Sequence, residues 1–321
     1  MPPFLARLAT LVGAAGLAAG CSHGSSTDAP SGVVTPVTFV SAAADAPPAP
    51  APSASSADGG AAGFVKANID YVLNPYNLPA YTGPTGSVEG TVTIDGPPAP
   101  SVTLDSSKCA ASIDMYGKLF REGAPVRPAG PRPLADAVVV VVGYTDYYVR
   151  EPSEVVKITI APPCAYPSRT LAITYGQRIE ISNESDLIFA PLIDEVSTPA
   201  VMVAPPRGTG EAIKLYPQRA GHFTLTDRLE GFVREDLYVF RHPLHAVTDR
   251  SGHFRIDGVP VGRLKLGVAH PGAGAQAEVP IDITAGGVQK ADVKVTYKPA
   301  APPPPKPASS EVIPPWKRPN E

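Results

Sequence analysis

The sequence predicts an all-β protein that folds as one or two β-sandwiches. Short runs of β-branched or alternating apolar and polar residues recur between turn residues through the middle of the chain, where amphipathic helical periodicity is hard to find. The 40 prolines among the 321 residues are unevenly spread, and Ala-, Pro- and Ser-rich stretches precede and follow this middle region. We therefore expect a folded part at about residues 65–298, flanked by a disordered N-terminal linker and a Pro-rich disordered tail.

The N-terminal segment has the layout of an export signal. Arg7 precedes an apolar run of about a dozen residues, which is too short to cross a bilayer. The run ends in Leu17-Ala18-Ala19-Gly20-Cys21, which resembles the lipobox of bacterial lipoproteins. This resemblance implies a signal peptide over residues 1–20 and lipid attachment at Cys21.

The same resemblance implies a location in the cell envelope. A palmitate-bearing lipoprotein would be held on a membrane through its N-terminal lipid, because more than one acyl chain makes anchoring stable. Ser22, directly after the cysteine, is similar to the outer-membrane address of double-membrane bacteria. One alternative stays open: Ala18 stands where lipoboxes usually carry Leu, and ordinary signal-peptidase cleavage near Ala19 would leave no lipid.

The segments that flank the sandwich region differ in composition. Residues 21–63 contain almost no aromatic side chain and cannot bury enough apolar surface to offset their ordering entropy, so we expect a disordered tether. Residues 64–85 are tyrosine-bearing and are expected to form a strap or an edge segment of the sandwich. The tail at 299–321 contains the polyproline run 302–307 and the single tryptophan, Trp316, which fits either a solvated tail or a docking segment.

Three strands are expected in the first half of the folded part. Residues 86–94 alternate between apolar and polar side chains and stop at Asp95-Gly96-Pro97-Pro98. Val138–Val142 is a run of five valines, which is typical of a buried strand. Residues 155–160 alternate again and stop at Pro162-Pro163.

The second half continues this pattern. Two strands are expected around a tight turn at Gly176, and a hairpin is expected to join residues 246–249 to residues 253–256 through Arg250-Ser251-Gly252. The other strands expected here, including the pair around Gly176, lie at residues 171–174, 179–182, 223–225, 237–240, 264–268, 279–283 and 293–297.

Two stretches resemble one known domain family. Residues 246–266 are similar to the closing half of carboxypeptidase regulatory-like (transthyretin-like) domains, with Gly252 at the turn and Phe254 and Ile256 facing the core. Residues 86–94, followed by 134–140, are similar to the opening of that domain. Arg263 departs from the pattern, which usually has an aromatic or small residue there.

The resemblance implies a β-sandwich in two parts, at residues 86–150 and 242–298. The domain family is named for sitting beside an enzyme and is not itself catalytic. A fold of this kind therefore implies no reaction.

Residues 151–241, between those two parts, resemble a second family. Cys164–Pro167 and Gly176–Asn183 are similar to the first half of cupredoxin-like (plastocyanin-like) domains. Copper in that fold needs two imidazoles and a thiolate, with a weak axial thioether. The stretches where the family carries these ligands, Asn183–Pro191 and Thr224–Val233, contain no histidine, cysteine or methionine. We therefore expect no metal and no cofactor.

The remaining histidines and cysteines suggest structural roles. His242 and His245 are separated by a proline and would point to opposite faces of a strand, so we expect neither to be a ligand. If lipidation uses Cys21, Cys109 and Cys164 remain, and two cysteines in an oxidising compartment are the number that one bridge needs. We expect a Cys109–Cys164 disulfide; two buried free thiols are the alternative.

The sequence favours a binding or structural role over catalysis. It contains no Gly-x-Ser-x-Gly elbow, His-Glu-x-x-His zinc helix or phosphate loop, and its net charge of −3 does not favour a nucleic-acid partner. We expect a non-catalytic, membrane-anchored envelope lipoprotein whose β-sandwich binds an envelope protein, a glycan or the cell wall. Cupredoxin-type electron transfer is the alternative. If the protein binds a ligand, the loop at residues 197–210 is the expected surface.

Overall fold

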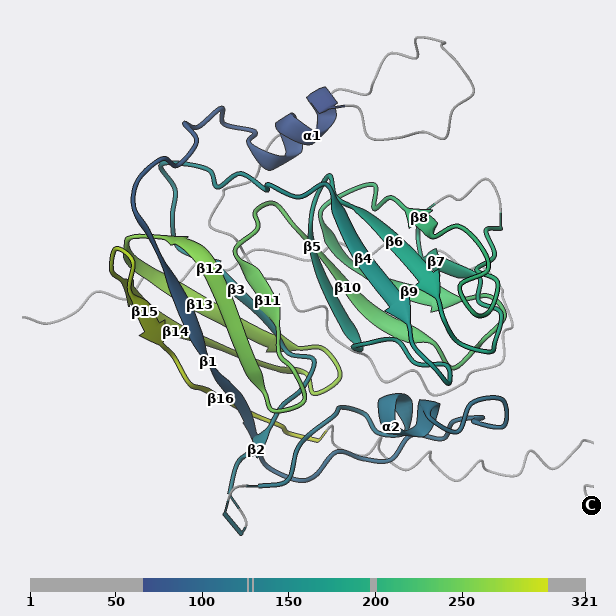
Figure 1. Cartoon of the computed structure of the whole chain (residues 1–321). Helices are drawn as coiled ribbons and strands as arrows, with labels where there is room; N and C mark the ends of the chain where they lie inside the picture. Colours follow the sequence, from purple (N-terminus) through teal and green to yellow (C-terminus); the bar gives the residue numbers. More distant parts are fainter. Residues whose placement is uncertain (1–65, 126, 129, 197–200, 300–321) are drawn as a thin grey trace, which may run out of the picture. The chain divides into compact units, whose positions relative to one another are not determined.

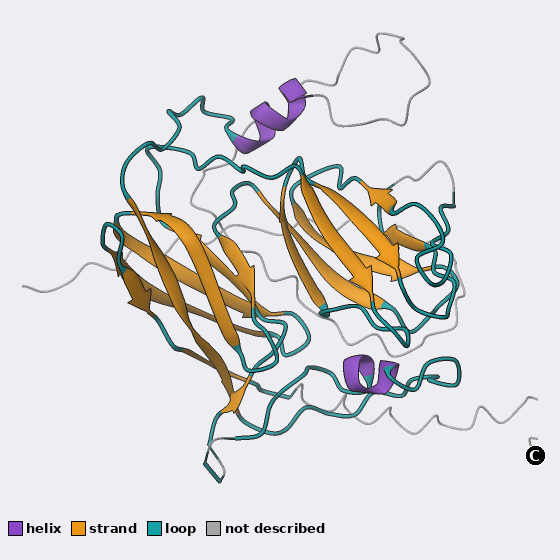
Figure 2. Cartoon of the chain, in the orientation of Figure 1, coloured by secondary structure: helices purple, strands orange, loops and turns teal. Residues whose placement is uncertain are grey.

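The computed structural model describes residues 66–299, apart from 126, 129 and 197–200. In this part of the chain nearly all regular structure is β, which confirms the predicted fold class (Figure 1). Two short helices, α1 (Lys66–Leu73) and α2 (Ser112–Tyr116), accompany the strands (Figure 2). Neither has the length and apolar character that a bilayer crossing requires. The predicted signal peptide, Cys21, the tether and the Pro-rich tail lie outside the described residues.

Strands from the two ends of the described region form the first sandwich. One sheet has the order β12-β1-β15, with β16 and β2 also paired to β1, and the other has the order β11-β3-β13-β14. Both sheets bury side chains in one core, among them Val88, Phe254 and Leu266. The strands are β1 (Thr85–Asp95), β2 (Arg132–Pro133), β3 (Val138–Val142), β11 (His245–Val247), β12 (His253–Pro260), β13 (Gly262–His270), β14 (Ala275–Ile283), β15 (Val288–Lys290) and β16 (Val293–Thr296).

The second sandwich lies in the sequence between β3 and β11. Its sheets have the orders β5-β10-β9-β7 and β4-β6-β8, and they share a separate core that includes Ile181, Phe189 and Leu225. Its strands are β4 (Val155–Ile160), β5 (Thr170–Thr174), β6 (Arg178–Asn183), β7 (Pro191–Ile193), β8 (Ile213–Leu215), β9 (Gly221–Asp227) and β10 (Arg234–Phe240).

The structure confirms the predicted turn at Gly252, but the prediction that the flanking strands pair as a hairpin is wrong. The Gly252 N–H donates to the Asp249 carbonyl at 2.9 Å, so the turn forms. However, β11 pairs with β3 and β12 pairs with β1, in different sheets. The strands on either side of Gly176 separate in the same way, since β5 pairs with β10 and β6 with β4. In each pair the chain passes from one sheet of the sandwich to the other at the turn, so that both strands can direct an apolar face into the shared core.

The segment expected to be a strap or an edge contains a helix that the sequence did not reveal. In α1, Ile69, Val72 and Leu73 have the i, i+3, i+4 spacing of one helix face, and they pack on the core of the second sandwich. Gly176 permits this approach, because a Cβ there would lie 2.7 Å from the Ile69 side chain. The helix ends at Leu73, just before the Asn74-Pro75 pair, as the restriction on residues that precede proline favours.

A long connection between β1 and β2 contributes to both cores. We call residues 97–122 the crossing segment. Cys109, Met115 and Tyr116 belong to the core of the second sandwich, whereas Phe120 belongs to the core of the first. The disulfide between Cys109 and Cys164 is present, with the Cα atoms 6.2 Å apart, and it attaches this segment to the second sandwich.

An ionic cluster joins the crossing segment to both sandwiches. The Asp136 carboxylate, just before β3, is completely buried and accepts two hydrogen bonds from the Arg121 guanidinium, at 2.6 and 2.5 Å. It also accepts the backbone N–H of Arg169, just before β5, at 3.0 Å. Pairing of this kind is what a buried charge needs.

A second buried carboxyl group, that of Glu235, lies close to this cluster. The Tyr116 hydroxyl donates to Glu235 Oε1, while Oε2 has no hydrogen-bond partner among the described residues. Burial raises the pKa of Glu235 to about 8, although the hydrogen bond from Tyr116 acts in the opposite direction. The carboxyl group is therefore mostly protonated at neutral pH.

Removal of the disulfide gives the first prediction. We expect Cys109→Ser/Cys164→Ser to lower the free energy of unfolding by about 4 kcal/mol, because the bridge joins residues 55 apart in the sequence and restricts the unfolded chain. Urea denaturation followed by circular dichroism measures the change. Cys21→Ser is the matched control and should leave the midpoint unchanged. Equal midpoints with and without the bridge would contradict the prediction.

The second prediction concerns pH. The folded-state pKa of Glu235 lies above its ordinary value of 4.5, so the folded state binds the proton more tightly and stability falls as pH rises from about 4.5 to about 8. Glu235→Gln keeps an acceptor for Tyr116 but does not ionise. We expect the free energy of unfolding of the variant, relative to the wild type, to increase steadily across this range.

Urea midpoints at several pH values between 5 and 9 test this expectation. The buried histidines act in the opposite direction, because burial lowers the pKa of His270 to about 4 and disfavours its charged form. Only the difference between variant and wild type therefore reports on Glu235. The exposed substitution Glu211→Gln is the control, and parallel pH profiles for Glu235→Gln and the wild type would refute the assignment.

Candidate functional site

Two adjoining pockets are formed by α1, the loop that follows it and the link between β3 and β4. Their volumes are about 970 and about 330 Å³, and Leu73, Asn74, Pro75 and Tyr148 line both, so they form one groove. We call it the tyrosine groove, because seven of the twelve tyrosines in the chain line it: Tyr71, Tyr76, Tyr144, Tyr147, Tyr148, Tyr175 and Tyr216. Tyrosine offers a rigid ring face together with a polar tip, a combination that is common at binding surfaces.

The loop after α1 is fixed by one asparagine. The Asn74 side chain accepts the Leu78 N–H at 2.8 Å and donates to the Leu78 carbonyl at 2.8 Å, which closes the loop that carries Tyr76. The Tyr76 side chain is 49% exposed, and that of Tyr71, on the helix, is 42% exposed. The backbone at the mouth of the groove is thus held in place while these two rings stay accessible.

Aromatic contacts order the wall of the smaller pocket. The rings of Tyr144 and Tyr147 are stacked with centroids 5.1 Å apart, and the Tyr81 ring lies 4.6 Å from that of Tyr147. Tyr144 also meets His242 edge to face at 5.6 Å. The Tyr144 hydroxyl is buried with no hydrogen-bond partner among the described residues, and burial raises the pKa of Tyr144.

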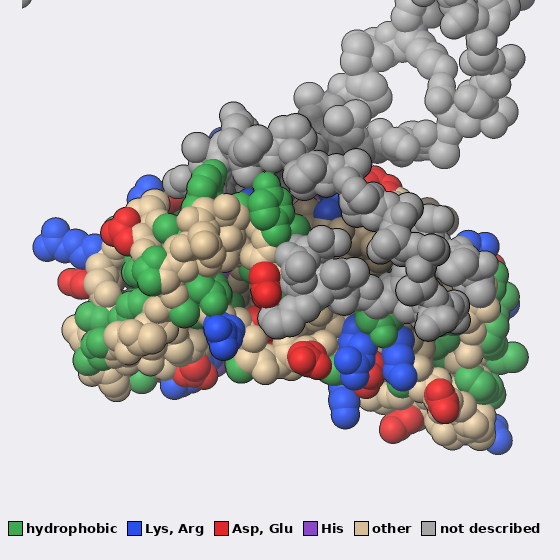
Figure 3. Space-filling model, turned by 90° about the horizontal axis from the view of Figure 1, so that it is seen from above, with side chains coloured by type: hydrophobic (Ala, Val, Ile, Leu, Met, Phe, Trp, Pro, Cys, Tyr) green, Lys and Arg blue, Asp and Glu red, His purple; other side chains and the backbone are tan. Residues whose placement is uncertain are grey.

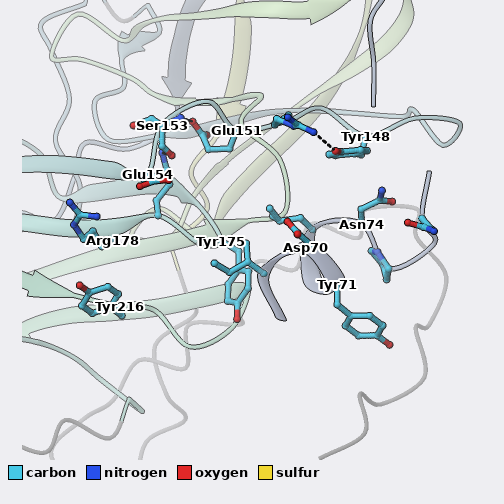
Figure 4. Close-up of a pocket in the computed structure, with 17 residues that line it drawn as sticks. Asp70, Tyr71, Asn74, Tyr148, Glu151, Ser153, Glu154, Tyr175, Arg178 and Tyr216 are labelled. Atoms are coloured by element: carbon cyan, nitrogen blue, oxygen red, sulfur yellow. Dashed lines mark hydrogen bonds between the residues drawn. The ribbon is translucent and has the colours of Figure 1, made fainter. Parts of the chain in front are cut away.

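Figure 4 shows Glu151 and Ser153 on one side of the larger pocket, and hydrogen bonds fix this side. Glu151 accepts the Ser153 N–H at 2.8 Å and the Thr174 hydroxyl at 2.7 Å. Gln177 accepts the Thr174 N–H at 2.7 Å and donates to the Ser153 carbonyl at 3.1 Å. These bonds join the link after β3 to the turn between β5 and β6, and they occupy groups that would otherwise be available for acid–base chemistry.

Charges of both signs surround the groove. Asp70, Glu151 and Glu154 are matched in number by Arg150, Arg178 and Arg241. In Figure 3, the described Lys and Arg side chains on the visible face are likewise interspersed with Asp and Glu. A balance of this kind does not favour a strongly charged ligand.

The two histidines of the His-Pro-Leu-His run have separate protein partners. His242 Nδ1 accepts the Leu244 N–H at 3.2 Å, and its ring lines the smaller pocket. His245 Nε2 lies 3.2 Å from the Thr174 hydroxyl. Burial lowers the pKa of His242 to about 4 and that of His245 to about 3, so both rings are neutral at pH 7.

Those predicted site residues that the structure describes do not line the groove. Cys21 lies outside the described residues, and Cys109 and Cys164 form the disulfide in the second sandwich. The described part of the expected binding loop, residues 201–210, lines neither pocket, although Val201 is 56% exposed. The sequence did not predict the groove, because its tyrosines come from segments far apart in the chain. The three tyrosines within residues 144–148 were the local feature that could have indicated it.

No metal centre is formed by the part of the chain that the structure describes, since no group of three or more His, Cys, Asp or Glu side chains could hold an ion there. Asp227, at the end of β9, lies within one of the stretches in which the cupredoxin resemblance places copper ligands. Its carboxylate accepts backbone N–H groups of Ala190 at 2.7 Å and of Leu229 and Glu230 at 2.9 Å. Asp227 therefore joins the loop before β7 to the loop after β9.

Comparison with known proteins finds similarity only among solved structures. No protein family and no curated protein matches the chain. A reduced mutant of amicyanin has a TM-score of 0.23 and 17% identity, covering 27% of this chain and 94% of its own. A copper-containing nitrite reductase from Thermus scotoductus has a TM-score of 0.22 and 19% identity, covering 30% of this chain and 25% of its own. Each of these two matches covers under a third of this chain.

The unpaired hydroxyl of Tyr144 generates a stability prediction. We expect Tyr144→Phe to leave the free energy of unfolding unchanged or to raise it by up to about 1 kcal/mol, because the substitution removes a buried polar atom that has no partner and keeps the ring contacts. Thermal and urea denaturation measure this. Tyr147→Ala is the comparison variant and should be less stable, since it loses the stack with Tyr144 and the tilted ring contact with Tyr81. A loss of more than about 1 kcal/mol in Tyr144→Phe would show that the hydroxyl has a structural partner.

Proposed function

We propose that this protein is a non-catalytic envelope lipoprotein that is anchored in the outer membrane by lipid on Cys21 and binds a ligand in the tyrosine groove. The observation that carries the proposal is the groove itself, which combines ordered aromatic walls with a volume of about 970 Å³ in its larger part. Ligand sites are typically concave, largely pre-formed and lined by aromatic side chains with a few polar groups.

The polar groups of the groove support binding rather than catalysis. The Thr174 hydroxyl belongs to a completely buried residue and is shared between Glu151 and His245. Thr174 lines neither pocket, whereas Ser153 lines the larger one, and Ser153 donates its hydroxyl to the Val155 carbonyl at 3.0 Å. Neither hydroxyl has the exposed nucleophile-and-base arrangement that covalent catalysis requires.

The membrane anchor is supported by the sequence alone, through the lipobox-like run that ends at Cys21. In the proposed arrangement, the chain between Cys21 and Lys66 leads directly into α1, and α1 forms one wall of the groove. The electron-transfer alternative has no ligand set in the described residues to support it.

Substitution of the proposed lipid-bearing residue tests the anchor. We expect wild-type protein, expressed in a double-membrane bacterium, to incorporate labelled palmitate and to enter the detergent phase on Triton X-114 partitioning, whereas Cys21→Ser should do neither. Ser22→Ala is the control, because it leaves the thiol in place. The anchor would be refuted if Cys21→Ser and wild type partitioned alike.

A further inference from the structure

We infer that the ligand of the tyrosine groove is an uncharged oligosaccharide. This inference rests on the proposed binding function and specifies its ligand class. It follows from three features of the groove: accessible aromatic faces, a rim of balanced charge and one hydroxyl that lacks a partner.

The aromatic faces come first. Tyr71 lies in α1 and Tyr76 in the loop that follows it, with 42% and 49% of their surfaces exposed, and Tyr148 and Tyr216 are half-buried in the same groove. A pyranose ring has an apolar face of C–H groups and an edge of hydroxyl groups. Its apolar face fits a tyrosine ring in the way that other flat apolar groups do, and tyrosine loses little conformational freedom on binding.

The polar rim gives the second argument. Saccharide hydroxyls both donate and accept hydrogen bonds. Next to the aromatic faces, carboxylates can accept from them and guanidinium groups can donate to them. The groove supplies both, in Glu154, which is exposed at its edge, and in Arg150, whose bond to the Tyr148 hydroxyl is long at 3.4 Å. Hydrogen bonds to ionised groups are stronger than neutral ones. Because acids and arginines are equal in number, a neutral ligand fits better than a polyanion or a polycation.

The third argument is the Tyr144 hydroxyl. Tyr144 lines the smaller pocket, and its hydroxyl is buried without a hydrogen-bond partner among the described residues, which costs free energy unless a ligand or water supplies an acceptor. The Tyr144 ring is fixed by its stack with Tyr147, so the hydroxyl is pre-positioned. A ligand that extends from the larger pocket and displaces part of the wall of the smaller one would bring a sugar hydroxyl to this atom.

A proline-rich peptide is the competing ligand class. Its pyrrolidine rings also pack on tyrosines, and aromatic grooves recognise such segments. Its backbone carbonyls can accept hydrogen bonds from the arginines along the rim, but proline has no N–H to donate to the carboxylates. The carboxylates of the rim are therefore what favours the saccharide, whose hydroxyl groups can donate to them.

Isothermal titration of the lipid-bearing full chain tests the inference, in a zwitterionic detergent without a sugar headgroup. The probes are the uncharged hexamers chitohexaose, cellohexaose and maltohexaose, with decaproline as the peptide probe. We expect at least one hexamer to bind, with an affinity that does not change between low and high salt. Tyr71→Ala/Tyr76→Ala should weaken that affinity about tenfold, and Tyr144→Phe about threefold to tenfold without loss of stability.

Ile113→Ala is the matched control, because Ile113 is 55% exposed and lines neither pocket. Binding of a hexamer that the groove variants leave unchanged would overturn the inference, as would decaproline binding with no hexamer binding. The latter result would leave the binding function intact. If neither probe class bound, the saccharide inference and the binding function would both fail, while palmitate labelling would still report separately on the anchor.

Discussion

The buried carboxylate of Asp136 is the constraint on which the arrangement of the chain depends. It accepts hydrogen bonds from a side chain of the crossing segment, Arg121, and from the backbone of Arg169 at the start of β5. Its backbone has a φ of +63°, in the left-handed region that Asp tolerates better than most residues. A buried charge that loses its partner is strongly destabilising, so these segments are held to one geometry. The disulfide and the Tyr116–Glu235 bond add to the same connection.

Strand β3 transmits this constraint to the groove. It begins two residues after Asp136, and Val139 and Val141 face the core of the first sandwich. Val138 lies on the opposite side, in a small cluster with Tyr238 of β10 and Ala269 of β13. Both faces of the strand are therefore buried, which explains why the sequence places five valines in a row. The chain then leaves β3 through Gly143 and reaches Tyr144, so one rigid strand has the ionic cluster at its start and the groove at its end.

The sequence was sufficient where a feature is local. The valine run, the alternating strands and the even pair of cysteines each follow from neighbouring residues or from simple counting. It was insufficient where a feature depends on distant partners. Helix α1 carries a short apolar stripe and packs against the second sandwich, where Gly176 leaves room for Ile69. The strands around Gly252 resemble a hairpin locally, but the burial of their apolar faces assigns them to separate sheets.

The groove, too, could not be predicted from neighbouring residues, because its lining comes from distant segments. Among the described residues with an unpaired buried polar atom, Tyr144 is distinguished by its place in the groove. Several buried polar atoms lack partners in the described residues, including Glu235 Oε2 and the Tyr238 hydroxyl, but those residues line neither pocket. Tyr144 differs because its unpaired atom belongs to a residue that lines a pocket and whose ring is fixed by stacking. Local departures from full polar satisfaction are expected at functional sites, where a ligand completes what the fold leaves open. Tyr144 is therefore the residue at which the proposed ligand binding can be separated experimentally from the stability of the fold.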